Sequence, residues 1–154
     1  MKRFFWIVVA IGVCMLVGYS ARFAQADALM NWYPLLDKPS VMPPNEVFPI
    51  AWGIIYVCMG VSVGLLCDAP REDKYPLMLL FAVQLVVNML WSVSFFYFQN
   101  PLLGLVNILV LDYLVVLYAM RSYSVNRLSA WLFVPYVLWL VFATYLNTYI
   151  YVMN

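Results

Sequence analysis

The sequence predicts an all-α membrane protein, a single domain of residues 1–154 built as a bundle of five transmembrane helices. Composition is the first reason. Hydrophobic residues make up 67% of the chain and charged residues 10%, whereas a soluble domain is about half apolar and about a quarter charged. The second reason is that five segments are apolar over the roughly 20 residues that a helix needs to cross a bilayer. A chain of this length cannot bury so much apolar surface, so its outer face is expected to contact lipid.

The five expected spans follow one another along the chain, separated by residues that interrupt helices. Their ranges are residues 4–24, 45–67, 76–98, 101–120 and 128–152. The three short connections are a charged turn at residues 68–74, a tight Asn-Pro turn at 100–101 and a polar hairpin at 121–127. The first span also resembles a secretory signal peptide, because Lys2 and Arg3 precede it and small residues follow it, but it is long for one.

The connection at residues 25–44 is longer than the others and differs from them in composition. It holds Trp32, Tyr33 and several prolines, which is more aromatic than a simple spacer requires. Long ordered loops of this kind are often functional. We expect this loop to act as a lid over one end of the bundle.

The distribution of positive charge predicts the orientation, because cytoplasmic loops carry an excess of Lys and Arg. With the five spans above, six of the eight Lys and Arg residues fall on one side. They are Lys2, Arg3, Arg71, Lys74, Arg121 and Arg127. The N-terminus is therefore predicted to be cytoplasmic, and the loop at 25–44 and the C-terminus are predicted on the opposite side.

Several classes of function are disfavoured by residue types. The chain has no His, which removes the commonest metal ligand and the commonest general base near neutral pH. Cys14, Cys58 and Cys67 lie in or beside apolar runs and are expected to be small buried hydrophobes rather than disulfide partners. The net charge is +1 and no basic patch is present, so no nucleic-acid partner is expected. No catalytic constellation is recognisable, and we predict no metal and no cofactor.

Aromatic and polar residues recur on one helical face of three spans. They are Trp52, Tyr56 and Met59 on the second span, Gln84, Asn88, Trp91, Ser92 and Phe95 on the third, and Tyr136, Trp139, Ala143 and Asn147 on the fifth. One interpretation is ordinary packing with interhelical hydrogen bonds. The other is an aromatic-walled pocket for a flat, largely apolar ligand. Trp52 and Trp139 favour the pocket, since each lies inside its helix and close to a proline, Pro49 or Pro135, that weakens the backbone hydrogen bonding.

Two further features leave alternatives open. Asp112 is the one acid deep in a span, and it is either functional or a hydrogen-bonded structural residue. No second acid or base completes a proton relay, which weakens a transport function. Gly60 and Gly64 form a small-xxx-small pattern that permits close helix approach, either within the bundle or in a homodimer.

Three groups of residues along the chain resemble one known family. The first combines Trp32-Tyr33 and Pro43-Pro44 with Trp52 and Tyr56-x-x-Met59-Gly60. The second is Gln84-x-x-x-Asn88-x-x-Trp91-Ser92-x-x-Phe95, and the third is Pro135-Tyr136-x-x-Trp139-x-x-x-Ala143-x-x-x-Asn147. In this order, and over nearly the whole chain, they are similar to the TspO/MBR family of tryptophan-rich sensory proteins and translocator proteins, also called the peripheral-type benzodiazepine receptor family.

The resemblance implies a five-helix receptor-like bundle, often a homodimer in membrane lipid, with a pocket that opens under the first loop. Family members bind porphyrins such as protoporphyrin IX, and isoquinoline or benzodiazepine drugs. The chain is accordingly expected to be a tetrapyrrole-binding sensor or translocator-type protein. Transferred to matching positions, the ligand-binding residues are Tyr33, Trp52, Asn88, Trp91, Ser92, Trp139, Ala143 and Asn147.

The resemblance also implies alternatives. Some bacterial members are reported to degrade protoporphyrin in a reaction that needs light and oxygen, and the two implicated tryptophans match Trp52 and Trp139. These residues would be catalytic only in that case. Transport of porphyrin or lipid is the other alternative. Sterol-like ligands are less expected, because the last residues, 149–154, lack the Lys or Arg of the cholesterol-recognition pattern found in mammalian members.

Overall fold

The computed structural model describes residues 2–154, with every side chain in that range except those of Asp68 and Arg71. Over these residues the chain is helical without a strand, and five helical segments are long and apolar enough to cross a membrane. The expected fold class is therefore confirmed. The crossings are α1 (Lys2–Asn31), α2 (Val47–Leu65), α3 (Arg71–Ser92) with its π-helical continuation η3 (Val93–Tyr97), α4 (Pro101–Val125), and α5 (Arg127–Trp131) together with α6 (Val134–Met153).

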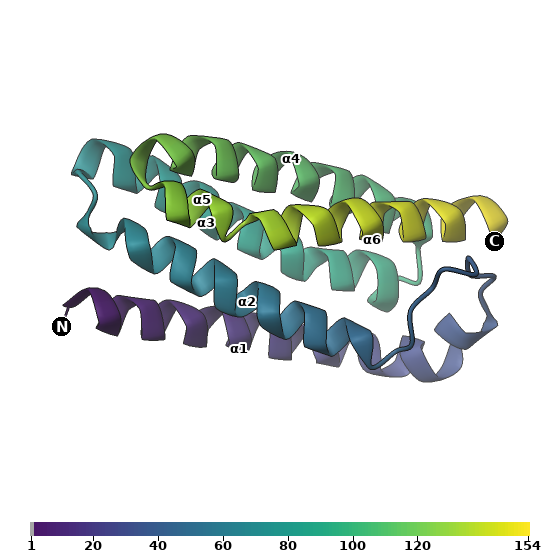
Figure 1. Cartoon of the computed structure of the whole chain (residues 1–154). Coiled ribbons are helices and arrows are strands. Elements are labelled where there is room, and N and C mark those ends of the chain that lie inside the picture. The colour runs from purple at the N-terminus through teal and green to yellow at the C-terminus, as the bar shows by residue number, and fades with distance from the viewer. Residues whose placement is uncertain (1) are drawn as a thin grey trace.

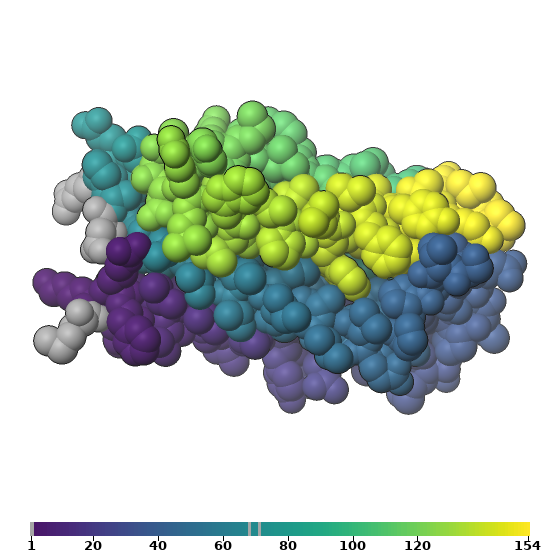
Figure 2. Space-filling model, in the orientation of Figure 1, coloured from purple at the N-terminus to yellow at the C-terminus, as the bar shows by residue number. Residues whose placement is uncertain are grey.

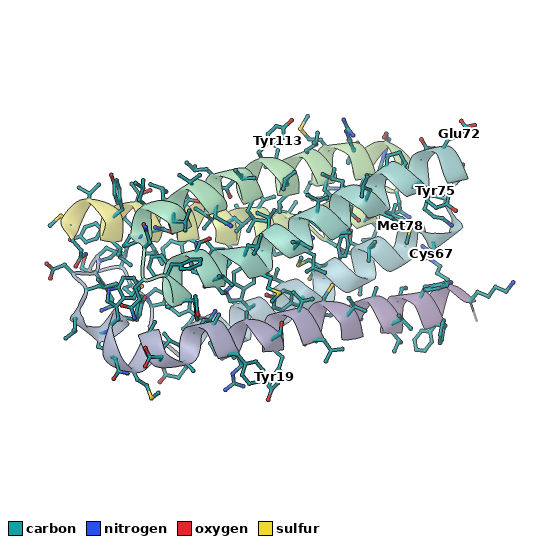
Figure 3. The ribbon with its side chains drawn as sticks, turned by 180° about the vertical axis from the view of Figure 1, so that it is seen from behind. Tyr19, Cys67, Glu72, Tyr75, Met78 and Tyr113 are labelled. Carbon is teal, nitrogen blue, oxygen red and sulfur yellow. The ribbon has the colours of Figure 1, made fainter. Side chains whose placement is uncertain are left out.

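The helices run roughly alongside one another, with the N-terminus at one end (Figure 1). The C-terminus and the loop between α1 and α2 lie at the other end. Seen from behind in Figure 3, Tyr113 points away from the bundle, and it is 66% exposed. Large exposed side chains of this kind suit a surface surrounded by lipid. Which end faces the cytoplasm stays a prediction.

The first helix is longer than predicted. α1 continues to Asn31, so the segment 25–31 is helical and the prediction that the loop begins at residue 25 is wrong. This segment contains no glycine or proline, and its Ala, Leu, Met and Gln residues favour helix. Ala28 is 2% exposed and packs against Phe95, Phe96 and Ile150, which supplies the tertiary contact that holds the extension.

Two of the predicted polar connections are also shorter than expected. Residues 71–74 of the charged turn belong to α3, where Glu72 and Asp73 occupy the first turn and favour the positive end of the helix dipole. α4 continues to Val125, so the hairpin expected at 121–127 is reduced to a break at Asn126. The Asn126 side chain accepts a hydrogen bond from the Ser129 backbone N–H at 3.1 Å and so begins α5 directly.

The last crossing is interrupted rather than continuous. A break at residues 132–133 separates α5 from α6, just before Pro135. Pro135 has no N–H to donate to the carbonyl of Trp131, four residues before it, and α5 ends at that residue. Pro49 likewise lies in the first turn of its helix, α2, where its missing N–H removes no intrahelical bond. The expectation that Pro49 weakens its helix is therefore wrong.

Close contact between α1 and α2 depends on the two glycines of the small-residue pattern. A Cβ atom at Gly60 would lie 2.5 Å from the Ile11 Cα atom, and one at Gly64 would lie 2.7 Å from the Ile7 Cα atom. These distances are too short for any side chain, so the backbones of the two helices touch here. The intramolecular interpretation of Gly60 and Gly64 is thus confirmed, and α1 of the same chain occupies the face that a homodimer would have used.

We predict that Gly60→Ala destabilises the bundle by about 1–3 kcal/mol, because the added methyl group must push α1 away from α2. Gly53→Ala is the matched control, since a Cβ atom at Gly53 meets nothing within 4 Å. Thermal unfolding in detergent, followed by circular dichroism, measures both. Equal midpoints for the two variants would contradict the backbone contact.

Candidate ligand-binding site

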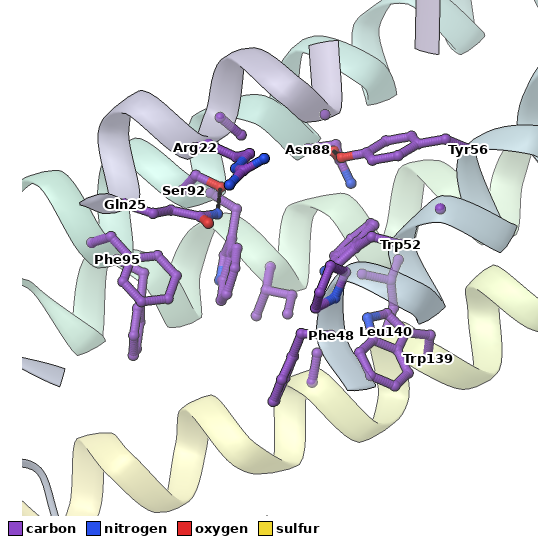
Figure 4. Close-up of a pocket in the computed structure, with 18 of the residues that line it drawn as sticks. Arg22, Gln25, Phe48, Trp52, Tyr56, Asn88, Ser92, Phe95, Trp139 and Leu140 are labelled. Carbon is purple, nitrogen blue, oxygen red and sulfur yellow. Dashed lines mark hydrogen bonds between the residues drawn. The ribbon is translucent and has the colours of Figure 1, made fainter. Parts of the chain in front are cut away.

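A cavity of about 1050 Å³ lies between the helices at the end of the bundle that carries the long loop. Ligand pockets commonly measure roughly 300–1,000 Å³, so this cavity is large enough for a ligand at the top of that range. Residues from α1, α2, α3 with η3, α4 and α6 line it, together with loop residues, and most of them are apolar. Figure 4 shows Trp52 and Trp139 on one side of the cavity and residues of α1 on the other.

The loop between α1 and α2 covers this end of the bundle. In Figure 2 its dark blue residues pack against the yellow C-terminal part of α6. Asn154 fastens the two together, because its Oδ1 atom accepts a hydrogen bond from the Asp37 backbone N–H at 2.8 Å and its Nδ2 atom donates to the Asp37 carbonyl at 3.1 Å. The loop therefore has the position expected of a lid.

Tyr33 is the aromatic residue that the lid contributes to the cavity wall. Its ring lies 5.6 Å from that of Phe96, and its hydroxyl donates to the Met42 sulfur at 3.6 Å. Burial raises the pKa of the Tyr33 phenol. The phenol is protonated at neutral pH, and its one hydrogen is donated to the Met42 sulfur.

Two indole rings form the aromatic side of the cavity. The rings of Trp52 and Trp139 meet edge to face, with centroids 6.5 Å apart, and Trp52 also stacks on Tyr56 at 5.5 Å. Phe48 packs against Trp139 from the first turn of α2 at 5.7 Å. Aromatic contacts of this kind fix the ring planes and leave broad apolar faces available for a flat ligand.

A buried hydrogen-bond network joins three helices beside these indoles. The Tyr56 hydroxyl on α2 donates to Asn88 Oδ1 on α3 at 3.0 Å, and Asn88 Nδ2 donates to the Tyr136 hydroxyl on α6 at 2.7 Å. Tyr136 is fully buried and Asn88 is 4% exposed. In an apolar interior such groups must pair with one another, so the network fixes how the three helices meet.

A second polar chain lies closer to the lid. Trp91 Nε1 donates to Asn147 Oδ1 at 3.2 Å, and Asn147 Nδ2 donates to the Pro101 carbonyl at 2.8 Å. The Trp91 ring stacks on Phe95 at 5.4 Å. These contacts hold the Trp91 indole in one orientation against the cavity.

The structure brings all eight sequence-predicted site residues to the wall of this one cavity. They are Tyr33, Trp52, Asn88, Trp91, Ser92, Trp139, Ala143 and Asn147. That they bind a ligand stays a prediction. Two other members of the predicted stripes, Met59 and Gln84, are fully buried and do not line the cavity. The Gln84 amide has no hydrogen-bond partner among the described residues.

Sequence reasoning missed the contribution of α1. Gly18, Tyr19, Arg22, Gln25 and Leu29 line the cavity, and Gln25 Nε2 donates to Ser92 Oγ at 2.8 Å. The first span carries no stripe of Trp and amide residues, so periodicity gave no reason to select it. The available signal was Arg22, the one charge inside the predicted span 4–24.

Asp112 lies outside the cavity wall and has a structural partner. The Thr144 hydroxyl on α6 donates to Asp112 Oδ2 on α4 at 2.8 Å. This hydrogen bond agrees with the structural interpretation of the acid, with Thr144 as the partner in place of the Asn or Tyr expected, and whether Asp112 also has a function stays open. No cluster of metal-ligating side chains is present among the described residues.

Comparison with known proteins shows which family the chain is similar to. A model of the TspO/MBR family matches residues 10–153. The chain is 34% identical to the tryptophan-rich protein TspO of Chlorobaculum tepidum, over 99% of this chain and 98% of that protein. It is 34% identical to the protein of the same name in Archaeoglobus fulgidus, over 96% of each. It is also 34% identical to the human translocator protein, over 82% of this chain and 76% of that protein.

We predict that Asn88→Leu lowers the free energy of unfolding by about 1–3 kcal/mol, because it strands the buried hydroxyls of Tyr56 and Tyr136. Removing all three polar groups in Tyr56→Phe, Asn88→Leu, Tyr136→Phe should restore part of that loss, since no unpaired group remains. Reversible unfolding in mixed micelles measures both. A triple variant that is less stable than Asn88→Leu alone would show that the loss does not come from unpaired hydroxyls of Tyr56 and Tyr136.

Proposed function

The chain belongs to the TspO/MBR family, and from that membership and its aromatic cavity we propose that it is an integral membrane protein that binds a tetrapyrrole such as protoporphyrin IX. Its task would be that of a sensor or translocator-type protein. The observation that carries the proposal is the pair Trp52 and Trp139, whose rings meet on the wall of a cavity of about 1050 Å³. Isoquinoline or benzodiazepine-type drugs are proposed for the same cavity.

The cavity suits a large flat ring for three reasons. Its walls are mainly apolar, so a porphyrin would leave the bilayer without exposing its ring to water. Trp52, Trp139 and Trp91 present indole faces or edges for stacking. Ser92 and Asn147 add a small number of polar atoms, which restrict how a ligand is oriented without requiring it to be polar throughout.

The names of relatives agree with this class of function. The matches include proteins named tryptophan-rich sensory protein and translocator protein. Binding followed by a signal, binding as sequestration, and transport would all begin with occupation of the cavity. Tetrapyrrole binding is therefore the step to test first.

A second candidate is oxidative degradation of the bound porphyrin, with molecular oxygen as oxidant and light as the energy source. The contact between Trp52 and Trp139 favours it, because two adjacent indoles beside an excited porphyrin could take up radical character. The chemistry would belong mainly to the porphyrin, and the protein would supply position and exclude water.

We predict saturable binding of protoporphyrin IX in the dark, at about one per chain, and an affinity about tenfold lower in Trp52→Phe, Trp139→Phe, which removes two stacking partners. The change in porphyrin absorbance measures binding without depending on the number of tryptophans. The control is Trp6→Phe, Trp131→Phe, because both residues are exposed and outside the cavity wall. The proposal would be contradicted if the two double variants lost porphyrin affinity equally, or if the wild-type protein showed no saturable binding.

Illumination in air separates the second candidate from simple binding. If the indoles take part, porphyrin should disappear faster with the wild-type protein than in empty detergent, and Trp52→Phe, Trp139→Phe should lose that excess rate. The rate is compared at saturating porphyrin, so that weaker binding does not imitate loss of chemistry. Bleaching at the rate of free porphyrin would exclude the enzyme function.

A further inference from the structure

Arg22 is the one charged residue among the described residues that line the cavity. It lies on α1, in the half of the helix closer to the lid. Its guanidinium carbon is 5.6 Å from the centroid of the Tyr19 ring, and it forms no ion pair with any residue that the structure describes. A charged side chain in a membrane-spanning helix is costly and normally faces a cavity or a partner. Arg22 faces the cavity, and none of the described side chains supplies an anion to pair with it.

The polar neighbours of Arg22 also offer hydrogen-bond donors. Gln25 lies three residues further along α1, on the same side of the helix, and lines the cavity too. Its Nε2 atom donates one hydrogen to Ser92 Oγ at 2.8 Å. The Ser92 hydroxyl hydrogen and the second Gln25 amide hydrogen remain available. Together with the guanidinium, this side of the cavity is rich in donors, while the side formed by Trp52 and Trp139 is mainly aromatic carbon, with the two indole nitrogens as its polar atoms (Figure 4).

Lining residues of α1 are exposed, as are Asn45 and Pro49 near the start of α2, so a ligand from the bilayer could keep a polar group on the α1 side. Four lining residues of α1 are well exposed, whereas Trp52 and Trp139 across the cavity are only partly exposed. Those four are Met15 (40%), Leu16 (69%), Tyr19 (58%) and Leu29 (41%). Arg22 is exposed as well. A ligand can thus place its apolar body among the aromatic rings and keep a charged group at the α1 side, beside Arg22.

We propose that Arg22, supported by Gln25 and Ser92, forms a carboxylate subsite that selects acidic ligands. The ligand class is a flat apolar ring system with one or more ionised carboxyl groups at its edge. Arginine suits this task, because its guanidinium remains charged and pairs with both oxygens of a carboxylate. The proposal rests on the proposed function for the identity of the ring, but the subsite itself requires only an amphiphilic acid.

The test compares protoporphyrin IX with its dimethyl ester, which keeps the ring and lacks the two ionised carboxylates. Both are titrated in the dark into nanodiscs of phosphatidylcholine that contain the wild-type chain, Arg22→Gln or Arg127→Gln. The last is a matched control, since Arg127 lies outside the cavity wall and its guanidinium sits over the Tyr123 ring at 5.5 Å, much as Arg22 sits over Tyr19.

We expect Arg22→Gln to weaken binding of the acid about tenfold or more and to leave binding of the ester unchanged, since a charge-assisted pair is lost only with the acid. Arg127→Gln should change neither. Arg22→Lys should recover part of the affinity for the acid, because it restores the charge without the planar fork. If Arg22→Gln weakens acid and ester equally, or neither, Arg22 only reaches the lipid headgroups and the subsite is refuted.

A second pair of probes separates this inference from the porphyrin proposal. The same three proteins are titrated with cis-parinaric acid and its methyl ester, whose fluorescence reports binding. If no protein binds either porphyrin, the proposed function fails. If Arg22→Gln then binds the fatty acid more weakly than the wild type does but binds its methyl ester equally well, the carboxylate subsite is still supported. Equal binding of acid and ester by all three proteins would overturn it.

Discussion

The network of Tyr56, Asn88 and Tyr136 is the interaction on which the arrangement of the helices around the cavity depends. Its two hydrogen bonds, 3.0 and 2.7 Å long, join α2, α3 and α6 at one level of the bundle. Apolar contacts alone tolerate sliding between helices, because lipid is as apolar as the helix surfaces. Buried polar groups do not tolerate it, since each would lose a hydrogen bond that no water or lipid replaces. The network therefore sets the register at which Trp52 and Trp139 come together.

The sequence was sufficient for the number of helices and for three of the cavity walls, because a transmembrane helix turns its polar and aromatic residues inward at a regular spacing. Trp52, Asn88 and Trp139 could be selected on that basis. Helix ends were predicted less well: the first and fourth spans were ended at residues 24 and 120, although α1 and α4 continue to Asn31 and Val125, because polar residues alone do not end a helix. The α1 wall was missed for a different reason, since its part in the cavity depends on small residues and on packing that no pattern records.

Glycine has opposite uses at the two ends of α2. Gly60 and Gly64 bring the backbone of α1 into contact with α2, whereas Gly53 borders the cavity and has open space where a Cβ would be. In the same half of α2 as Gly60 and Gly64, the hydroxyl groups of Ser62 and Ser129 lie 2.7 Å apart and join α2 to α5. The half of the bundle near the N-terminus is thus tightly packed, and the half near the lid is hollow.

This division explains how a chain of 154 residues can hold a large cavity and remain folded. A cavity costs stability because its lining side chains lose packing partners. Here the backbones of α1 and α2 touch at Gly60 and Gly64, below the cavity, while the Tyr56, Asn88 and Tyr136 network lies beside it. The lid is held by the two hydrogen bonds between Asp37 and Asn154, both at exposed positions, and by the packing of Trp32, Tyr33 and Leu36 against Phe95, Phe96 and Ile150. Opening the lid end would break these contacts and leave the contact between α1 and α2 undisturbed, because Gly60 and Gly64 lie outside the cavity wall.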